Sequence, residues 1–260
     1  MKKLVLLSFV FVSMTLAAQP KVLSHRGFYT NPETDENSIQ SVKNGQQYGV
    51  WGMEFDVHKT ADGELIIYHN HNINPKVHCQ LSDWKEIQTI VLPHGERIPT
   101  LRQWLEQARQ TPEIKLALEL KTHPTHEKET EVIEDILKLV RELDMMDQMA
   151  FLSFSKWACK EFVRLAPEAY VVLNSSETDE WIDPDTAKRL GFSAISYEKR
   201  VFRKHPEYID RANEIGIDTY YWMVDTEAEL DWAIEHKVSH ITSNFPDKME
   251  AMITSKCGHK

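Results

Sequence analysis

Short apolar segments alternate with amphipathic segments along most of the chain, and no other feature limits its fold as strongly. The apolar segments are four to seven residues long and mostly rich in Val, Ile, Leu, Tyr or Phe, as buried strands are. They predict eight strands, at residues 21–24, 51–57, 114–120, 149–154, 170–173, 194–197, 217–223 and 239–242. Apolar residues at helical spacing predict eight helices, at residues 36–48, 101–110, 127–143, 156–165, 184–190, 207–215, 227–236 and 246–253.

Eight strand–helix repeats favour a closed (β/α)8 barrel, the TIM barrel, as the fold class. The alternative for such a repeat is an open, doubly wound parallel sheet. That fold usually carries a GxGxxG loop after its first strand, and no such loop follows residue 24. Because no Pro-, Gly- or Ser-rich linker divides the chain, we expect residues 19–260 to form a single domain.

A short insertion is expected after the second strand. The dipeptide Asp62-Gly63, a two-residue turn signal, separates the strand at 51–57 from a further strand candidate at 65–68. Residues 70–99 then form a longer excursion than the barrel alone requires. This excursion either caps the rim of the barrel or packs against its side.

The first 18 residues have the pattern of a secretory signal peptide. Lys2 and Lys3 form a basic start, residues 4–16 are almost entirely apolar, and small residues follow. A membrane-spanning helix, the alternative, needs about 20 apolar residues. We therefore expect residues 1–18 to be removed and the mature chain to be exported, either to a periplasm or out of the cell.

The chain is acidic. Its formal net charge is −10, and it becomes −12 once the two lysines of residues 1–18 are removed. Such a surface repels nucleic acids and anionic membranes, so we expect no nucleic-acid partner and no stable membrane insertion. The oligomeric state is left open. If the substrate carries a phosphate, local positive charge has to overcome the overall negative field.

Three carboxylates stand where two predicted strands end. Glu54 and Asp56 share one face of the second strand because side chains alternate with a period of two, and Glu119 ends the third. Active sites of (β/α)8 barrels lie at these carboxyl ends. A lone Glu-x-Asp is usually a solvated strand end. Three inward carboxylates on neighbouring strands are costly unless paired or bound to metal, so they predict a site for one Ca²⁺ or Mg²⁺.

Basic side chains occur at the same strand ends. His25 follows the first strand and His69 the added strand, where both are suited to proton transfer near neutral pH. Arg26 and Lys121 would add positive charge for a phosphate. Taken singly, His25 could cap a turn and His69 could donate to a backbone carbonyl. Their occurrence at successive strand ends favours a catalytic site.

A set of motifs covers nearly the whole mature chain. In order they are Ser24-His25-Arg26-Gly27, Glu36-Asn37-Ser38, Glu54-Phe55-Asp56-Val57, Thr60-Ala61-Asp62-Gly63, Tyr68-His69, Ile98-Pro99-Thr100-Leu101, Glu119-Leu120-Lys121, Trp222-Met223-Val224 and Ile241-Thr242-Ser243-Asn244-Phe245-Pro246-Asp247. On these motifs the chain resembles the glycerophosphodiester phosphodiesterase family.

The resemblance implies a (β/α)8 barrel and a role for each of ten side chains. The metal ligands would be Glu54, Asp56 and Glu119, and the general acid–base pair would be His25 and His69. The substrate-binding residues would be Arg26 and Lys121 on the phosphate, Glu36 and Asn37 shaping the site, and Trp222 lining the pocket.

The implied activity is metal-dependent hydrolysis of glycerophosphodiesters to glycerol 3-phosphate and an alcohol such as choline or ethanolamine. The glycerol hydroxyl beside the ester would attack phosphorus, and water would then open the cyclic phosphate. Two alternatives stay open. One is a phospholipase D-like enzyme that releases a cyclic phosphate from phospholipids or lysophospholipids, and the other is a non-catalytic barrel that binds phosphodiesters.

One position departs from the family pattern. The family usually has Asp after the second histidine, whereas this chain has Asn70. A carboxylate beside His69 would favour the charged imidazolium more than a neutral amide does. We therefore expect His69 to be less basic here than in relatives with Asp.

Overall fold

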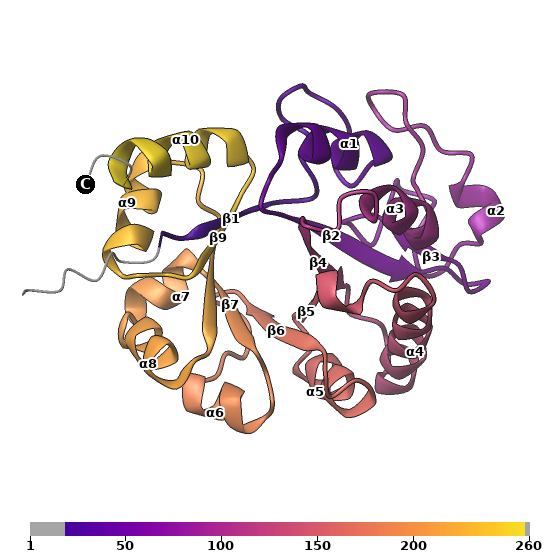
Figure 1. Cartoon of the computed structure of the whole chain (residues 1–260). Coiled ribbons are helices and arrows are strands. Elements are labelled where there is room, and N and C mark those ends of the chain that lie inside the picture. The colour runs from indigo at the N-terminus through magenta and orange to yellow at the C-terminus, as the bar shows by residue number, and fades with distance from the viewer. Residues whose placement is uncertain (1–18, 258–260) are drawn as a thin grey trace, which may run out of the picture.

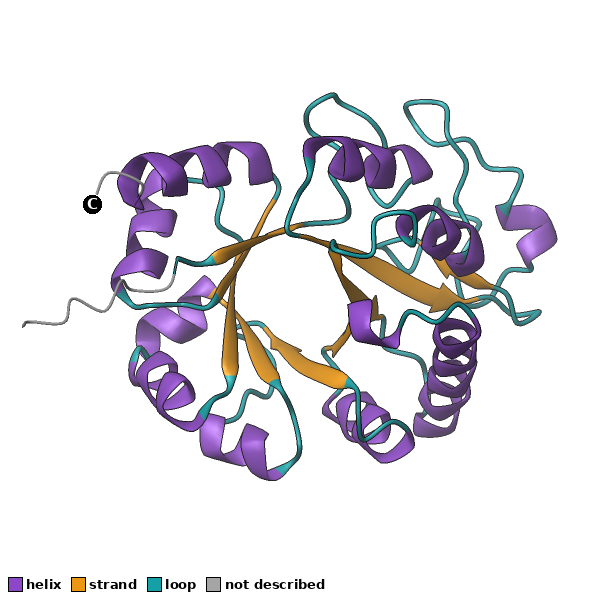
Figure 2. Cartoon of the chain, viewed as in Figure 1, coloured by secondary structure: helices purple, strands orange, loops and turns teal. Residues whose placement is uncertain are grey.

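Eight parallel strands close into a ring in the computed structural model, which describes residues 19–257 (Figures 1 and 2). The order around the ring is β1-β9-β8-β7-β6-β5-β4-β2, and pairing of β1 with β2 closes it. The ring strands are β1 (Lys21–Ser24), β2 (Gly52–Lys59), β4 (Lys115–Leu120), β5 (Met149–Ser153), β6 (Tyr170–Ser175), β7 (Ala194–Glu198), β8 (Asp218–Trp222) and β9 (His240–Ser243). The predicted (β/α)8 barrel is confirmed.

Helices surround the ring on its outer side, as Figure 2 shows. They are α1 (Ile39–Tyr48), α2 (Trp84–Ile87), α3 (Leu101–Ala108), α4 (His126–Glu142), α5 (Lys156–Leu165), α6 (Pro184–Arg189), α7 (Lys199–Lys204), α8 (Glu207–Ile215), α9 (Glu227–Glu235) and α10 (Pro246–Cys257). All eight predicted helices occur. The short helix α7 was not predicted, because four of its six residues are Lys or Arg and it has no apolar periodicity.

The start of α1 differs from the prediction in a way that matters for the site. The helix begins at Ile39 rather than at Glu36, because the Ser38 side chain accepts a hydrogen bond from the Ser41 N–H as an N-cap. Asn37 has a positive φ of 59°, outside helical geometry. Glu36 and Asn37 therefore belong to the loop that follows β1.

The alternation of side chains along β2 divides its residues between two environments. Phe55 and its neighbours on that face join the apolar core between strands and helices, where the Phe55 ring stacks on Trp104 at 3.9 Å between centroids. Glu54, Asp56 and His58 lie on the opposite face and are buried. Because the first face fills the core, the second brings polar groups into the barrel.

The predicted insertion is present. The extra strand β3 (Leu65–Ile67) pairs antiparallel with β2 outside the ring, and α2 lies beside it at the edge of the molecule (Figure 1). Five residues separate the paired ends Lys59 and Leu65, so the turn is longer than the two residues predicted. The insertion has its own apolar cluster, which includes Ile66 and Ile87.

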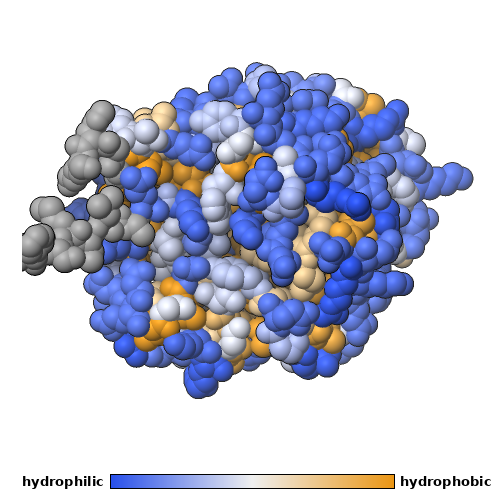
Figure 3. All heavy atoms as spheres, in the orientation of Figure 1, coloured by the Kyte–Doolittle hydropathy of each residue, from blue (hydrophilic) through white to orange (hydrophobic). Residues whose placement is uncertain are grey.

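The face of the molecule drawn in Figure 3 is predominantly polar. Figure 3 shows hydrophilic residues over most of one face, with apolar residues gathered in recesses between them. Within residues 19–257 no helix is both long and apolar enough to span a membrane. The predicted signal peptide, residues 1–18, lies outside the described residues.

Candidate active site

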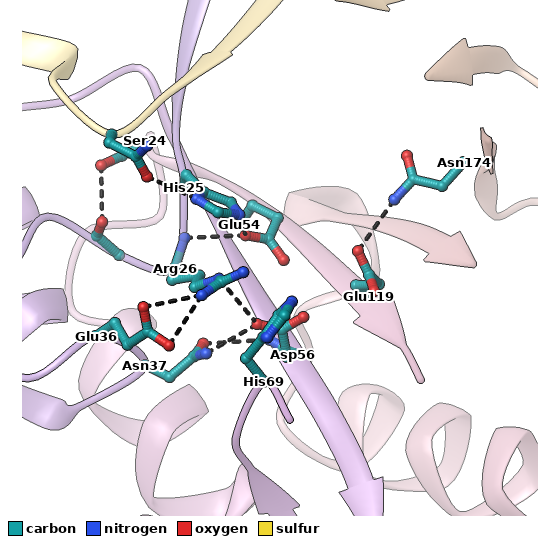
Figure 4. Close-up of polar contacts among 12 residues, drawn as sticks. Ser24, His25, Arg26, Glu36, Asn37, Glu54, Asp56, His69, Glu119 and Asn174 are labelled. Carbon is teal, nitrogen blue, oxygen red and sulfur yellow. Dashed lines mark hydrogen bonds and ion pairs between the residues drawn. The ribbon is translucent and has the colours of Figure 1, made fainter. Parts of the chain in front are cut away.

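Three carboxylates meet inside the barrel at the carboxyl ends of β2 and β4. Asp56 and Glu119 are register partners on the two strands, and Glu54 lies two residues before Asp56 (Figure 4). Glu54 is 4%, Asp56 1% and Glu119 7% exposed. One oxygen from each lies within 4.8 Å of the others. The structure thus brings the three predicted metal ligands together, and we call them the carboxylate triad.

Hydrogen bonds hold two members of the triad in place. Lys121 Nζ donates to Asp56 Oδ1 at 3.1 Å and to Glu119 Oε1 at 2.7 Å. Asn37 Nδ2 donates to Asp56 Oδ2 at 2.8 Å, and Asn174 Nδ2 donates to Glu119 Oε2 at 3.1 Å. Although burial alone would raise it, the Lys121 charge holds the pKa of Asp56 below its usual value.

Glu54 has fewer hydrogen-bond partners than the other two carboxylates of the triad. Its Oε2 accepts the Arg26 backbone N–H at 2.9 Å, but buried Oε1 has no hydrogen-bond partner among the residues that the structure describes. Burial raises the pKa of Glu54 well above its ordinary value, and the charges of Asp56 and Glu119 add to this effect. An unpartnered oxygen within a set of three carboxylates fits a hard divalent cation such as Ca²⁺ or Mg²⁺.

Arg26 binds one carboxylate of the site through its backbone and another through its side chain. Its φ of 55° is positive, and this turn directs the N–H toward Glu54 while the guanidinium reaches Glu36, 3.0 and 2.9 Å from the two carboxylate oxygens. Its buried Nε has no hydrogen-bond partner in the described structure and lies 3.8 Å from Asp56 Oδ2. Arg26 and Lys121 are therefore the positive groups next to the triad.

A chain of polar groups orients His25. Its Nδ1 lies 2.7 Å from Asn244 Oδ1, and Asn244 Nδ2 donates to Asp225 Oδ2 at 2.7 Å. Because an amide oxygen only accepts, Nδ1 carries the proton and Nε2 faces the triad, 4.0 Å from Glu54. Burial, with the Arg26 charge adding, lowers the pKa of His25 to about 4, so the ring is neutral at pH 7.

The second histidine follows β3. His69 Nδ1 lies 2.9 Å from Asn70 Oδ1, which leaves Nε2 free to face the site. Burial lowers the pKa of His69, and the charges of Lys121 and Arg26 act in the same direction. Position 70, where this chain has Asn instead of the family's usual Asp, therefore contacts the His69 ring directly.

The two histidines border one cavity of about 180 Å³ above the triad. Its walls include six of the ten predicted site residues, namely His25, Arg26, Glu54, His69, Glu119 and Trp222. Arg26 donates to Glu36 and Lys121 donates to Glu119, and Lys121 and Asn37 both donate to Asp56. The Trp222 ring packs against Phe154 at 6.0 Å between centroids. All ten predicted residues therefore belong to one site.

Sequence reasoning missed Asn174 and Phe154, which line this cavity, and the orienting role of Asn244. Each stands at the carboxyl end of a strand, and that position was the available signal. A larger cavity of about 550 Å³ opens at the other end of the barrel, where the strands begin. None of the ten predicted residues lines it, so cavity size does not identify the site.

The fold and the location of the site define the chain as a (β/α)8-barrel enzyme with its chemistry at the carboxyl ends of the strands. Residues 25–248 match the family model described as the glycerophosphoryl diester phosphodiesterase family. The chain belongs to this family.

Individual relatives agree with that assignment. A glycerophosphodiester phosphodiesterase structure from Parabacteroides distasonis is 31% identical, with a TM-score of 0.88 over 92% of this chain and 98% of its own. A curated glycerophosphodiester phosphodiesterase from Caldanaerobacter subterraneus is 23% identical over 88% of this chain and 95% of its own length. A phosphodiesterase from Oleispira antarctica, solved with the product sn-glycerol-3-phosphate, shares the fold at 21% identity and a TM-score of 0.77, over 90% of this chain and 97% of its own.

Proposed function

We propose that the protein hydrolyses glycerophosphodiesters to glycerol 3-phosphate and an alcohol, using one divalent cation and two histidines. The observation that carries the proposal is the convergence of His25, His69 and the carboxylate triad on one cavity. Membership of the family supports the reaction, and the product bound to the Oleispira antarctica relative supports glycerol 3-phosphate as a ligand of such a site.

The chemistry divides between the cation and the side chains. Bound at the triad, Ca²⁺ or Mg²⁺ would supply positive charge that lowers the pKa of the glycerol hydroxyl beside the ester. One histidine takes that hydroxyl's proton while the oxygen attacks phosphorus and the bond to the leaving alcohol breaks. The other histidine donates its proton to the departing oxygen. The product of this step is a cyclic phosphate.

Water completes the reaction with the two histidines in reversed roles. The histidine that gave up its proton takes one from water, whose oxygen bonds to phosphorus. The first histidine returns its proton to the ring oxygen that leaves, which yields glycerol 3-phosphate. Arg26 and Lys121 orient the phosphate and offset its charge, Glu36 and Asn37 position Arg26 and Asp56, and Trp222 borders the glycerol.

The two alternative activities require other products. A phospholipase D-like enzyme would stop at a cyclic phosphate on a phospholipid or lysophospholipid, and a binding barrel would release no product. A site with two histidines at the triad has more acid–base capacity than binding alone needs. We also propose that the mature chain is exported, to a periplasm or out of the cell, because residues 1–18 have the signal-peptide pattern.

Removal of the cation tests the proposed function. We expect EDTA to abolish release of glycerol 3-phosphate from glycerophosphocholine, glycerophosphoethanolamine and glycerophosphoglycerol, and excess Ca²⁺ or Mg²⁺ to restore it, because the triad needs positive charge to work. EDTA already saturated with Ca²⁺ is the control and should leave activity intact. Absence of metal-dependent release from every one of these substrates would count against the proposal.

Substitution of Asn70 by aspartate tests the environment of His69. The new carboxylate would replace an amide oxygen 2.9 Å from His69 Nδ1 and favour the imidazolium, which raises the pKa of His69. We expect the limb of the pH–rate profile that reports this histidine to move to higher pH by about 0.5 pH unit or more. Asn72→Asp, in the same exposed loop, is the control. An unchanged profile in Asn70→Asp would mean that position 70 does not tune His69.

A further inference from the structure

A second cavity, of about 500 Å³, adjoins the candidate active site. It lies between the loop after β1, residues 92–94 of the insertion, and Phe245 just before α10. Its lining residues include the acidic Glu33, Asp35 and Glu36 and the aromatic Tyr29, Tyr68 and Phe245. None of the roles assigned so far uses this space, which we call the acidic–aromatic pocket.

Two connections place the acidic–aromatic pocket next to the 180 Å³ cavity. Glu36 lines it and pairs through both carboxylate oxygens with Arg26, which lines the smaller cavity. Tyr68 lines it and precedes His69, which lines the smaller cavity. The two cavities therefore adjoin through the Arg26–Glu36 pair and the Tyr68–His69 segment.

The charges of this pocket are mostly negative. Glu33, Asp35 and Glu36 line it, and His94 is the one basic side chain among its lining residues. Two N–H groups, of His94 and Glu96, hold the Asp35 carboxylate in the wall at 3.1 to 3.4 Å. The Glu33 side chain is 82% exposed and lies 3.7 Å from His94 Nε2, and His94 Nδ1 lies 3.3 Å from Asp35 Oδ1. Glu36 is paired with Arg26, so three carboxylates stand against the side chains of Arg26 and His94. The formal charge that remains is negative and favours a positive ligand.

Aromatic rings supply a second attraction for a cation. Tyr29 and Tyr68 line the acidic–aromatic pocket together with Phe245. The Lys248 ammonium already lies 4.1 Å from the centroid of the Phe245 ring, so that ring has one cation against it. The two tyrosines have no such partner among the described residues. Ring faces of this kind bind ammonium groups, and quaternary ones in particular.

We propose that the acidic–aromatic pocket holds the leaving alcohol and selects a cationic amino alcohol over a neutral polyol. The proposal rests on the proposed function, because it assigns the second half of the same substrate. The glycerol half occupies the smaller cavity, and the ammonium of a choline or ethanolamine ester meets the carboxylates and tyrosines. The aromatic faces favour the quaternary group of choline over the primary group of ethanolamine.

The first test compares substrates on the wild-type holoenzyme. We expect kcat/KM to be about tenfold higher for glycerophosphocholine than for glycerophosphoglycerol, with glycerophosphoethanolamine between them. The advantage of the two cationic substrates should shrink as salt is added, because Glu33 is exposed to solvent. Equal values for the three substrates would overturn the proposal.

The second test reverses one charge at the rim of the pocket. Glu33→Lys should lower kcat/KM for glycerophosphocholine about fivefold or more, leave glycerophosphoglycerol within about twofold, and weaken product inhibition by choline. Glu113→Lys makes the same charge change on an exposed residue just before β4, at the opposite end of the barrel, and should alter neither substrate.

The results separate this proposal from the one it rests on. If the wild type hydrolyses glycerophosphoglycerol and glycerophosphocholine equally and Glu33→Lys lowers both or neither, the pocket assignment fails while the reaction stands. If the wild type with Ca²⁺ or Mg²⁺ hydrolyses no glycerophosphodiester, the proposed function itself fails.

Discussion

Replacement of His25 by alanine is expected to lower kcat for hydrolysis of glycerophosphocholine about 10²- to 10⁴-fold, the usual contribution of a positioned acid–base group. The ring is neutral at pH 7, its Nε2 faces the triad, and Asn244 fixes its orientation. Cation binding should persist, because His25 is not a member of the triad. Release of glycerol 3-phosphate and calorimetric titration with Ca²⁺ measure the two effects separately.

An exposed histidine provides the matched control. His126 begins α4 and stacks on Trp157 away from the site, so His126→Ala should keep wild-type turnover. A His25→Ala enzyme within tenfold of the wild type would show that this ring does not carry the proton. Loss of Ca²⁺ binding together with activity would instead give His25 a part in holding the cation.

Glu54→Gln is expected to weaken Ca²⁺ or Mg²⁺ binding more than about 100-fold, because substitutions even outside the ligand shell cost 10- to 100-fold. The same substitution should stabilise the metal-free protein. Folding raises the pKa of Glu54, so its deprotonation at neutral pH costs more free energy in the folded than in the unfolded chain. We expect the free energy of unfolding of the metal-free protein to rise by about 1 kcal/mol, with a higher Tm.

Thermal melts with and without cation measure both effects of Glu54→Gln. The wild type should gain Tm on addition of Ca²⁺, whereas the variant should start higher and gain little. Glu129→Gln is the control, since Glu129 is also buried, at 3% exposure, but lies on α4 and accepts a hydrogen bond from Ser155. A Glu54→Gln protein that is less stable without cation would contradict the destabilising effect assigned to the buried Glu54 charge.

Periodicity was sufficient to predict the barrel. Each ring strand overlaps its predicted segment because its outward face is apolar, and Glu54 and Asp56 were found because they interrupt such a strand at its carboxyl end. The helix α7 escaped prediction because its stability comes from packing of Val201 and Phe202 rather than from an amphipathic pattern.

The roles of two asparagines in the site were missed for a common physical reason. Asn174 and Asn244 act through amide groups, and asparagine occurs so often in turns and helix caps that its presence after a strand indicates no particular role. The acidic–aromatic pocket could not be predicted either. It joins Glu33 to His94 across 60 intervening residues, and their approach depends on how the insertion packs.

Arg26 sets a limit on what mutagenesis can reveal about this site. Its guanidinium pairs with Glu36, but the group that holds Glu54 is the backbone N–H, which every substitution except proline leaves in place. Proline would remove that N–H, but its ring requires φ near −65° and the residue has φ of 55°. Alanine scanning will therefore report the contribution of the Arg26 guanidinium but not that of its backbone N–H, so the total contribution of this position will be underestimated.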